Sequence, residues 1–329
     1  MSRISPPLAP AGAPTRPALT IAPKPRDWAL LVGVVILGGS AFSGIRAALL
    51  SAAPLTVAAG RLWVAAFAMA IIMRVAGERW PALIDQGRLN PLWGSAIAIG
   101  LIGYSMPMTM FPLAQLTVPS LLAGIYMAFM PIATVILAAA YADEPLTRGK
   151  MIGTALGFAG ALTLIGPAAF RNILAADVVA QLMLLAATLG YAIAAVLLRR
   201  AAPLAALSFT SMMLIAGALG ASLPAILIER GDGLPTLQGA AAIVYLGLFP
   251  TALNGLIITL MVRSAGAGFL GLANYFTPFA AIGFGLVLFN EALLANHLAG
   301  LFLALAGVFV AQPRPLLTLF KWLQDRRGV

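Results

Sequence analysis

The sequence contains two related stretches, LTVPSLLAGIYMAFMPIATVILAAAYADEPLTRGKMIGTALGFAGALTL at residues 116–164 and RSAGAGFLGLANYFTPFAAIGFGLVLFNEALLANHLAGLFLALAGVFVA at residues 263–311. Three residue types recur in the same order at one offset of 147 positions, in these pairs: Gly124 and Gly271, Pro131 and Pro278, Glu144 and Glu291, Gly153 and Gly300, Gly160 and Gly307. In a chain with 33 Gly and 23 Pro, one match would carry no weight. Five matches at a single offset indicate a duplicated unit, which is a common feature of membrane transporters.

The composition defines the class of protein. Hydrophobic residues make up 61% of the chain and charged residues only 9%, whereas soluble domains contain about 45–50% and about 25%. Too few polar side chains are present to cover a water-soluble globule, so the sequence predicts a polytopic membrane protein. The net charge of +10 does not indicate nucleic-acid binding, because the basic residues lie between hydrophobic spans.

Ten apolar segments follow a proline-rich start, and each is long enough to cross about 30 Å of hydrocarbon at about 1.5 Å per residue. They are expected near residues 28–50, 55–77, 91–112, 118–141, 150–167, 177–198, 204–228, 239–262, 267–289 and 296–312. Spans of this length that must satisfy their own backbone in lipid are helices rather than barrel strands. The predicted fold is an all-α polytopic membrane protein with ten transmembrane helices.

The basic residues predict the orientation. If the N-terminus is cytoplasmic, 16 Lys and Arg residues fall in cytoplasmic segments, and only Arg171 and Arg230 fall on the other side. This asymmetry follows the positive-inside rule and places both termini in the cytoplasm, with a bacterial inner membrane as the expected location. Five spans per copy is an odd number, so the second copy enters the membrane upside down, and such inverted repeats enclose a central site.

Four regions are therefore predicted. They are a disordered, proline-rich cytoplasmic tail at 1–27, a first five-helix repeat at 28–168, a second, inverted repeat at 177–312, and a basic cytoplasmic tail at 313–329. Proline as dense as in the first of these prevents a packed helix.

Two pairs of segments carry a resemblance to a known family. Pro131-Ile-Ala-Thr leads to Asp143-Glu144-Pro145-Leu146-Thr147, and Asn274-Tyr275-Phe276-Thr277-Pro278 leads to Asn290-Glu291-Ala292-Leu293; in addition, Gly60-Arg61-Leu62 opens the second span. Together they resemble the EamA-type exporters of the drug/metabolite transporter superfamily, over about residues 28–312. The resemblance implies two inverted five-helix halves and the movement of amino acids, other metabolites, nucleotide sugars, purines or cationic drugs.

One mechanism of that superfamily does not fit this sequence. Its small four-helix members use a glutamate in their first helix, but this chain has no Asp or Glu from Trp28 to Arg74. The absence of an acid there argues against that form of proton coupling, and it favours facilitated diffusion or exchange.

Arg46 and Arg61 are the two charged residues that fall inside predicted spans, both toward the outer side. Burying such a charge in a membrane costs about 2.5–3.5 kcal/mol or more, so each arginine needs a partner or water. Two interpretations are open: each binds a substrate carboxylate, or each is structural, through snorkelling or a bond to Glu291 or a helix C-terminus.

The repeated proline and glutamate are predicted to be structural or gating residues. Glu144 and Glu291 follow apolar runs, so each is expected to cap the helix that comes next, the fifth and the tenth, with proton coupling as the alternative. Pro131 and Pro278 each remove a backbone hydrogen bond, and they are either hinges or static kinks.

Polar side chains deep in the spans are the remaining candidates for substrate binding. Hydroxyl and amide groups in hydrocarbon need hydrogen-bond partners, so they either bond between helices or line a polar cavity at the membrane midplane. These candidates are Tyr104, Tyr126, Tyr191, Asn254, Asn274 and Tyr275.

The sequence contains none of the common catalytic or metal-binding patterns. It has no cysteine and one histidine, His297, and it has no P-loop and no nucleophile–histidine–carboxylate set, so no cofactor or metal is expected.

The predicted function is a secondary transporter that exports small metabolites, amino acids in particular, by alternating access. The alternatives are a membrane-embedded lipid-modifying enzyme and a transporter of drugs or nucleotide precursors. The expected partners are a small-molecule substrate and the lipid bilayer, with no nucleic acid, in a monomer or homodimer.

Overall fold

A computed structural model describes residues 23–114 except 86, and then 116–117, 126–127, 129–165, 177–229, 235–289 and 295–311. Residues 1–22 of the predicted N-terminal tail, all of the predicted C-terminal tail and Glu291 therefore lie outside the described residues, as do the side chains of Arg46 and Pro278.

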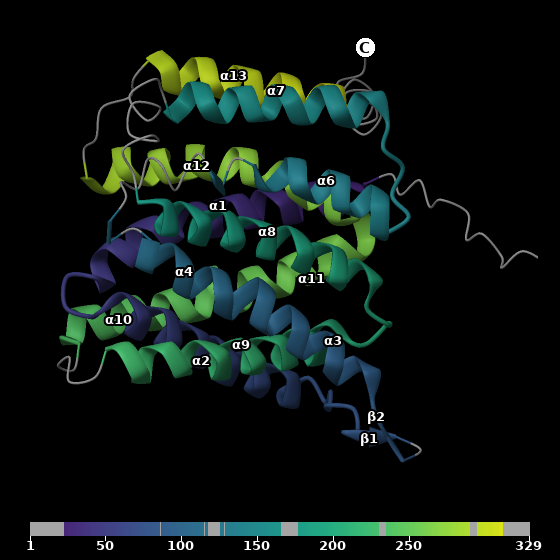
Figure 1. The fold of residues 1–329 in the computed structure, drawn as a ribbon, viewed down its shortest axis with the longest axis vertical. Helices are drawn as coiled ribbons and strands as arrows, with labels where there is room; N and C mark the ends of the chain where they lie inside the picture. The colour runs from purple at the N-terminus through teal and green to yellow at the C-terminus, as the bar shows by residue number, and fades with distance from the viewer. Residues whose placement is uncertain are drawn as a thin grey trace, which may run out of the picture.

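The described chain is a bundle of helices, drawn in Figure 1. Their bounds are α1 (Pro25–Ala48), α2 (Pro54–Val75), α3 (Pro91–Gly100), η1 (Leu101–Ser105), α4 (Met106–Ala114), α6 (Met130–Tyr141), α7 (Arg148–Ile165), α8 (Val178–Arg200), α9 (Ala206–Ile228), α10 (Leu237–Leu246), η3 (Gly247–Leu253), α11 (Asn254–Ala265), α12 (Ala267–Phe289) and α13 (Ala295–Ala311). The helical prediction is confirmed. The sequence did not predict a two-residue hairpin, β1 (Ile84–Asp85) with β2 (Arg88–Leu89).

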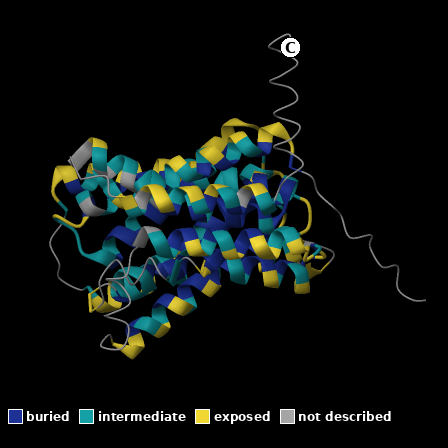
Figure 2. Ribbon diagram, turned by 90° about the horizontal axis from the view of Figure 1, so that it is seen from above, coloured by how far each residue is buried: buried dark blue, intermediate teal, exposed yellow. Residues whose placement is uncertain are grey.

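Six segments of the described chain are long and apolar enough to cross a membrane. They are Pro25–Ile45, Pro54–Val75, Pro91–Ala114, Val178–Arg200, Ala206–Ile228 and Leu237–Ala265, with shorter apolar helices beside them. Large apolar side chains such as Phe67, Leu223 and Phe302 are exposed on the outside of the bundle, where Figure 2 shows many exposed positions. A lipid environment accounts for this surface, and the protein is an integral membrane protein.

Local sequence explains where many helices begin. Pro25, Pro54 and Pro91 each occupy the first turn of a helix, where their missing N–H needs no partner. Asp177 and Thr236 are N-caps whose side chains accept hydrogen bonds from Val179 N and Gly239 N.

Two of the long segments contain a π-helical turn at equivalent positions. η1 joins α3 to α4, and η3 joins α10 to α11, and the starts of the two turns, Leu101 and Gly247, lie 146 residues apart. The duplication therefore extends beyond the two stretches of similar sequence. A π-turn widens a helix locally and is frequent at functional sites, so the side chains of these two turns are candidates for the functional site.

The pair α2 and α9 shows directly that the two halves are inverted. Glu229, at the end of α9, accepts hydrogen bonds from Leu55 N (2.7 Å), Thr56 N (2.7 Å) and Thr56 Oγ1 (2.9 Å) at the start of α2. Glu78, just after α2, accepts from Ser208 N (3.0 Å) and Ser208 Oγ (2.8 Å) at the start of α9. Equivalent helices thus run antiparallel and exchange the same contact, which a two-fold axis in the membrane plane produces. We call this arrangement the reciprocal glutamate caps.

The reciprocal glutamate caps give a prediction about stability. Replacing Glu229 by glutamine is expected to destabilise the protein more than replacing Glu78 by glutamine, because Glu229 uses both carboxylate oxygens and Glu78 only one. Each hydrogen bond to a charged group contributes about 1.5–3 kcal/mol. Thermal unfolding of the two purified variants in detergent measures the difference, and equal melting temperatures would show that the caps do not contribute as their geometry indicates.

The last helices of the two halves, α7 and α13, lie side by side along one edge of the bundle in Figure 1. Their contact includes the glycines that the duplication repeats. A Cβ on Gly160 would lie 2.7 Å from Gly300 O, and a Cβ on Gly153 would collide with Gly307 O and Ala311 Cβ. Small residues let two membrane helices approach closely, so these glycines join the halves.

Candidate functional site

The buried arginine of α2 is the starting point of the site. Arg61 is only 8% exposed, and its Nε donates a hydrogen bond to Thr251 Oγ1 at 3.0 Å. Thr251 belongs to η3 and donates in turn to Leu246 O at 2.8 Å, a bond five residues back along the π-turn. Gly247 allows α2 to approach, since a Cβ there would lie 2.5 Å from Val64 Cβ and 2.8 Å from Arg61 O. The π-turn of the second half therefore positions the arginine of the first half.

Arg61 has no acidic partner among the described residues. The ion pair found in that part of the chain joins Lys150 Nζ to Glu144 Oε2, 3.5 Å apart, and does not involve Arg61. The two terminal NH₂ groups of Arg61 donate to no described residue. A guanidinium offers five N–H donors, so most of its hydrogen-bonding capacity is unused within the described structure.

Two tyrosines complete the surroundings of this arginine. Tyr191 of α8 interacts electrostatically with Arg61, and Tyr104 of η1 interacts in the same way with Tyr191. Tyr191 stacks on Phe111 of α4, with ring centroids 6.4 Å apart. We call Arg61, Tyr104, Tyr191 and Thr251 the core cluster. Tyr104 and Thr251 occupy equivalent positions in η1 and η3, 147 residues apart, so the cluster lies where the two halves meet.

Glycines place the ring of Tyr104 against two helices of the second half. A Cβ on Gly217 of α9 would lie 2.9 Å from Tyr104 Cβ, and a Cβ on Gly255 of α11 would lie 2.7 Å from Tyr104 Oη. The hydroxyl group therefore lies at the first turn of α11, which begins with the partly buried Asn254.

Asn254 and Asn274 each contain a buried polar atom without a hydrogen bond. The atoms are Asn254 Oδ1 and Asn274 Nδ2, and the described residues add Trp28 Nε1 and one terminal nitrogen of Arg263. Most buried polar atoms are hydrogen-bonded, so an unpaired one calls for an explanation such as a bound molecule. Asn254 is three residues after Thr251, whereas Asn274 lies on α12.

Tyr126 and Tyr275 are not part of the core cluster. Tyr126 Oη donates to Gln181 Oε1 of α8 at 2.8 Å. Tyr275 is 1% exposed, and its Oη donates to Thr154 O of α7 at 2.8 Å, with its ring packed against Gly157. Both hydroxyl groups form bonds between helices, so we leave these tyrosines out of the proposed site. Arg46 lies two residues before the end of α1.

Glu144 does not cap the helix that follows it, so this prediction was wrong. Its Oε1 accepts from Ala267 N at 2.7 Å and its Oε2 from Gly268 N at 3.2 Å, at the start of α12. The start of α7 is instead capped by Thr147 Oγ1, which accepts from Lys150 N. Gly266, at φ +92°, turns the chain so that the first amides of α12 face the carboxylate. Glu144 thus connects the first half to the second.

Both repeated prolines lie in helices. Pro131 is buried in the first turn of α6, and its Cβ would lie 3.5 Å from a Cβ on Gly271, another residue of the duplicated pattern. Pro278 lies inside α12.

A buried acid at the start of α1 was not among the residues predicted from the sequence. Asp27 was assigned to the N-terminal tail, but α1 begins at Pro25 and Asp27 is 0% exposed. Its Oδ1 accepts from Ser264 Oγ of α11 at 2.5 Å and its Oδ2 from Lys24 N at 2.7 Å. A carboxylate two residues after an initial proline is a signal for a helix start that the proline-rich context obscured. Asp27 and Glu144 both link the first half to the second.

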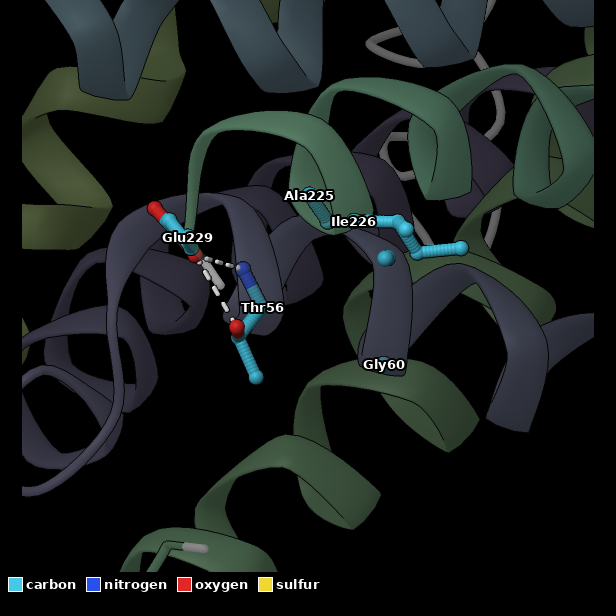
Figure 3. A pocket seen from close by; sticks show the side chains of 6 residues that line it. Thr56, Gly60, Ala225, Ile226 and Glu229 are labelled. Atoms are coloured by element: carbon cyan, nitrogen blue, oxygen red, sulfur yellow. Dashed lines mark hydrogen bonds between the residues drawn. The ribbon is translucent and has the colours of Figure 1, made fainter. Parts of the chain in front are cut away.

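A hollow on the surface, drawn in Figure 3, is separate from the core cluster. It has a volume of about 440 Å³ and is lined by Thr56, Ala59, Gly60, Ala225, Ile226 and Glu229. Both oxygens of the Glu229 carboxylate are bonded to the start of α2, and the rest of the lining is mainly apolar. The hollow therefore offers less to a polar substrate than the core cluster does.

Three comparisons agree with this architecture. A crystal structure, described only as that of a protein, superposes with a TM-score of 0.72 at 20% identity, and the match covers 89% of this chain and 99% of that chain. An uncharacterized transporter from Archaeoglobus fulgidus is 25% identical over 150 residues, which is 45% of this chain and 50% of that protein, so the match spans about half the length of this relative. The model of the EamA-like transporter family matches twice, at residues 27–166 and 178–311. One match to each inverted half confirms the resemblance found in the sequence and favours a transporter over a lipid-modifying enzyme: the chain belongs to the EamA-like transporter family.

Proposed function

We propose that this transporter exports small metabolites that carry a carboxylate group, amino acids in particular, and that Arg61 binds that carboxylate. The observation that carries the proposal is a buried arginine inside a membrane span with no acidic partner among the described residues. A charge in that position costs about 2.5–3.5 kcal/mol or more, and an anionic ligand would compensate it.

The chemistry of the core cluster suits this role. A guanidinium binds a carboxylate through two parallel hydrogen bonds, and the terminal NH₂ groups of Arg61 are unused by described residues. The hydroxyl groups of Tyr104 and Tyr191 add polar contacts beside it. Because Arg61 and Tyr104 come from the first half and Thr251 and Tyr191 from the second, a bound substrate would contact both halves.

Contacts between the halves would have to change during alternating access. Asp27 with Ser264, and Glu144 with the start of α12, join the halves at one end of the bundle. With both termini in the cytoplasm, as the distribution of basic residues supports, that end is the cytoplasmic one, and the expected membrane is the bacterial inner membrane. Hydrogen bonds of this kind can break and re-form at modest cost, about 0.5–3 kcal/mol each.

The test is counterflow in proteoliposomes loaded with unlabelled L-amino acids, with uptake of the same labelled amino acid as the readout. We expect accelerated exchange for at least one amino acid and none for the corresponding amine without a carboxylate. Because Asp27 is a buried acid, the assay is repeated with an imposed pH gradient to distinguish exchange from proton coupling. Counterflow of nucleotide precursors or cationic drugs, without any for amino acids, would overturn the proposed substrate class.

A further inference from the structure

We propose that Asn254 receives the ammonium group of the substrate, so that the site selects zwitterionic amino acids over carboxylates that lack an amino group. This inference rests on the proposed function, because it takes Arg61 as the site for the carboxylate. It assigns a second specificity residue, Asn254, to the ammonium group of the substrate.

The first argument is the unpaired acceptor. Asn254 Oδ1 is buried and accepts no hydrogen bond. Leaving a buried polar atom unpaired costs about 1–3 kcal/mol, and a leucine of similar size would avoid that cost. A ligand that brings a hydrogen-bond donor would pair this acceptor when it binds. An ammonium group is suited to that, because it carries donors and no acceptor.

The second argument is the position of Asn254 relative to Arg61. Thr251 holds Arg61 Nε at 3.0 Å, and Asn254 comes three residues later on the same continuous helical segment, η3 into α11. Residues 251 and 254 are therefore less than one turn apart along this segment, in which Thr251 belongs to the π-turn and Asn254 directly follows it. The carboxylate and ammonium groups of an α-amino acid are bonded to one carbon atom, so receiving groups this near each other along one segment suit them.

The third argument is the chemistry of the neighbours. Tyr104 Oη lies at Gly255, the residue after Asn254, and offers a second neutral acceptor. No described acidic side chain is paired with Arg61. A carboxylate at position 254 would pair with Arg61 and occupy the substrate's place, whereas a neutral amide accepts from an ammonium group and leaves Arg61 available.

The experiment compares matched ligands by thermal stabilisation of the purified protein in detergent, since a ligand that binds only the folded state raises its apparent stability. The probes are L-phenylalanine with 3-phenylpropanoate, and L-leucine with 4-methylpentanoate, each pair differing only in the amino group. The wild-type protein is expected to bind the amino acid about ten- to a hundredfold more tightly, the usual effect of one hydrogen bond to a charged group. Equal affinity for both members of a pair would overturn the role of Asn254 and leave the carboxylate site intact.

The variant Asn254→Leu provides the second readout. It is expected to lose the preference for the amino acid, to bind the des-amino acid as the wild type does, and to melt at the same or a higher temperature without ligand. A purely structural asparagine would give the reverse, a lower melting temperature and an unchanged preference. If Asn254→Leu does not fold, Asn254→Ala is compared in the same way. Binding of neither member of either pair, with no L-amino acid active in counterflow, would instead contradict the proposed function itself.

Discussion

Arg61→Gln is expected to lower the rate of amino-acid counterflow roughly thirtyfold or more while the protein stays folded. Truncating one partner of a buried, hydrogen-bonded charge pair costs about 2–5 kcal/mol, and 1.4 kcal/mol corresponds to a factor of ten. Without substrate, by contrast, the variant loses a buried charge that has no acidic partner among the described residues. Thr251 keeps its own bond to Leu246 O, so the melting temperature should be unchanged or higher.

The comparison needs a variant with the same chemical change elsewhere. Arg200 is exposed at the end of α8, and Arg200→Gln should transport like the wild type. Arg61→Lys keeps the charge but not the two-pronged geometry of a guanidinium, so an intermediate rate is expected. Wild-type counterflow by Arg61→Gln would show that the buried arginine is a structural group and does not bind substrate.

Gly153→Ala is expected to destabilise the protein strongly, although it adds a single methyl group. The new Cβ would collide with Gly307 O and Ala311 Cβ, and these include a backbone atom that cannot move without shifting α13. Overpacking of this kind costs about 1–3 kcal/mol or more. Thermal unfolding and size-exclusion chromatography in detergent should reveal a lower melting temperature and a smaller monodisperse fraction.

The matched control is Gly94→Ala. Gly94 lies in α3, and a methyl group placed there would have no neighbour within 4 Å, so alanine should gain up to about 1 kcal/mol in helix propensity. Equal melting temperatures of the two alanine variants would show that Gly153 is not required for the close contact of α7 with α13.

The helical spans could be read from the sequence because hydropathy is a property of the local chain. The second span, expected at 55–77, is observed at Pro54–Val75, and the fifth, expected at 150–167, is observed at Arg148–Ile165. The duplication itself was visible because glycines and prolines are kept at a fixed offset. The role of these glycines could not be predicted from the sequence, because Gly153 and Gly307 come into contact only after the two halves have folded together.

Contacts between distant residues account for what sequence reasoning missed. Glu144 stands beside the start of α7, and a local argument assigned it there, but its partners lie 123 and 124 residues away on α12. Thr251 was overlooked because a threonine in an apolar span is usually bonded to its own helix. The neighbouring Pro250 inside the span was the available signal that the helix changes its winding there. Arg61, Tyr104, Tyr191 and Asn254 could be named as candidates from the sequence because polar groups in hydrocarbon are rare and need hydrogen-bond partners.

The reciprocal glutamate caps have a consequence for the origin of the protein. Glu229 follows Glu78 by 151 residues, and Ser208 follows Thr56 by 152, so one pattern in the chain makes the same contact twice. A single five-helix polypeptide inserted in both orientations would form both contacts as an antiparallel homodimer, using one glutamate per copy. Fusion of two such genes requires no new contact at these helix ends, and each copy could afterwards diverge, the first acquiring its arginine and the second its asparagine.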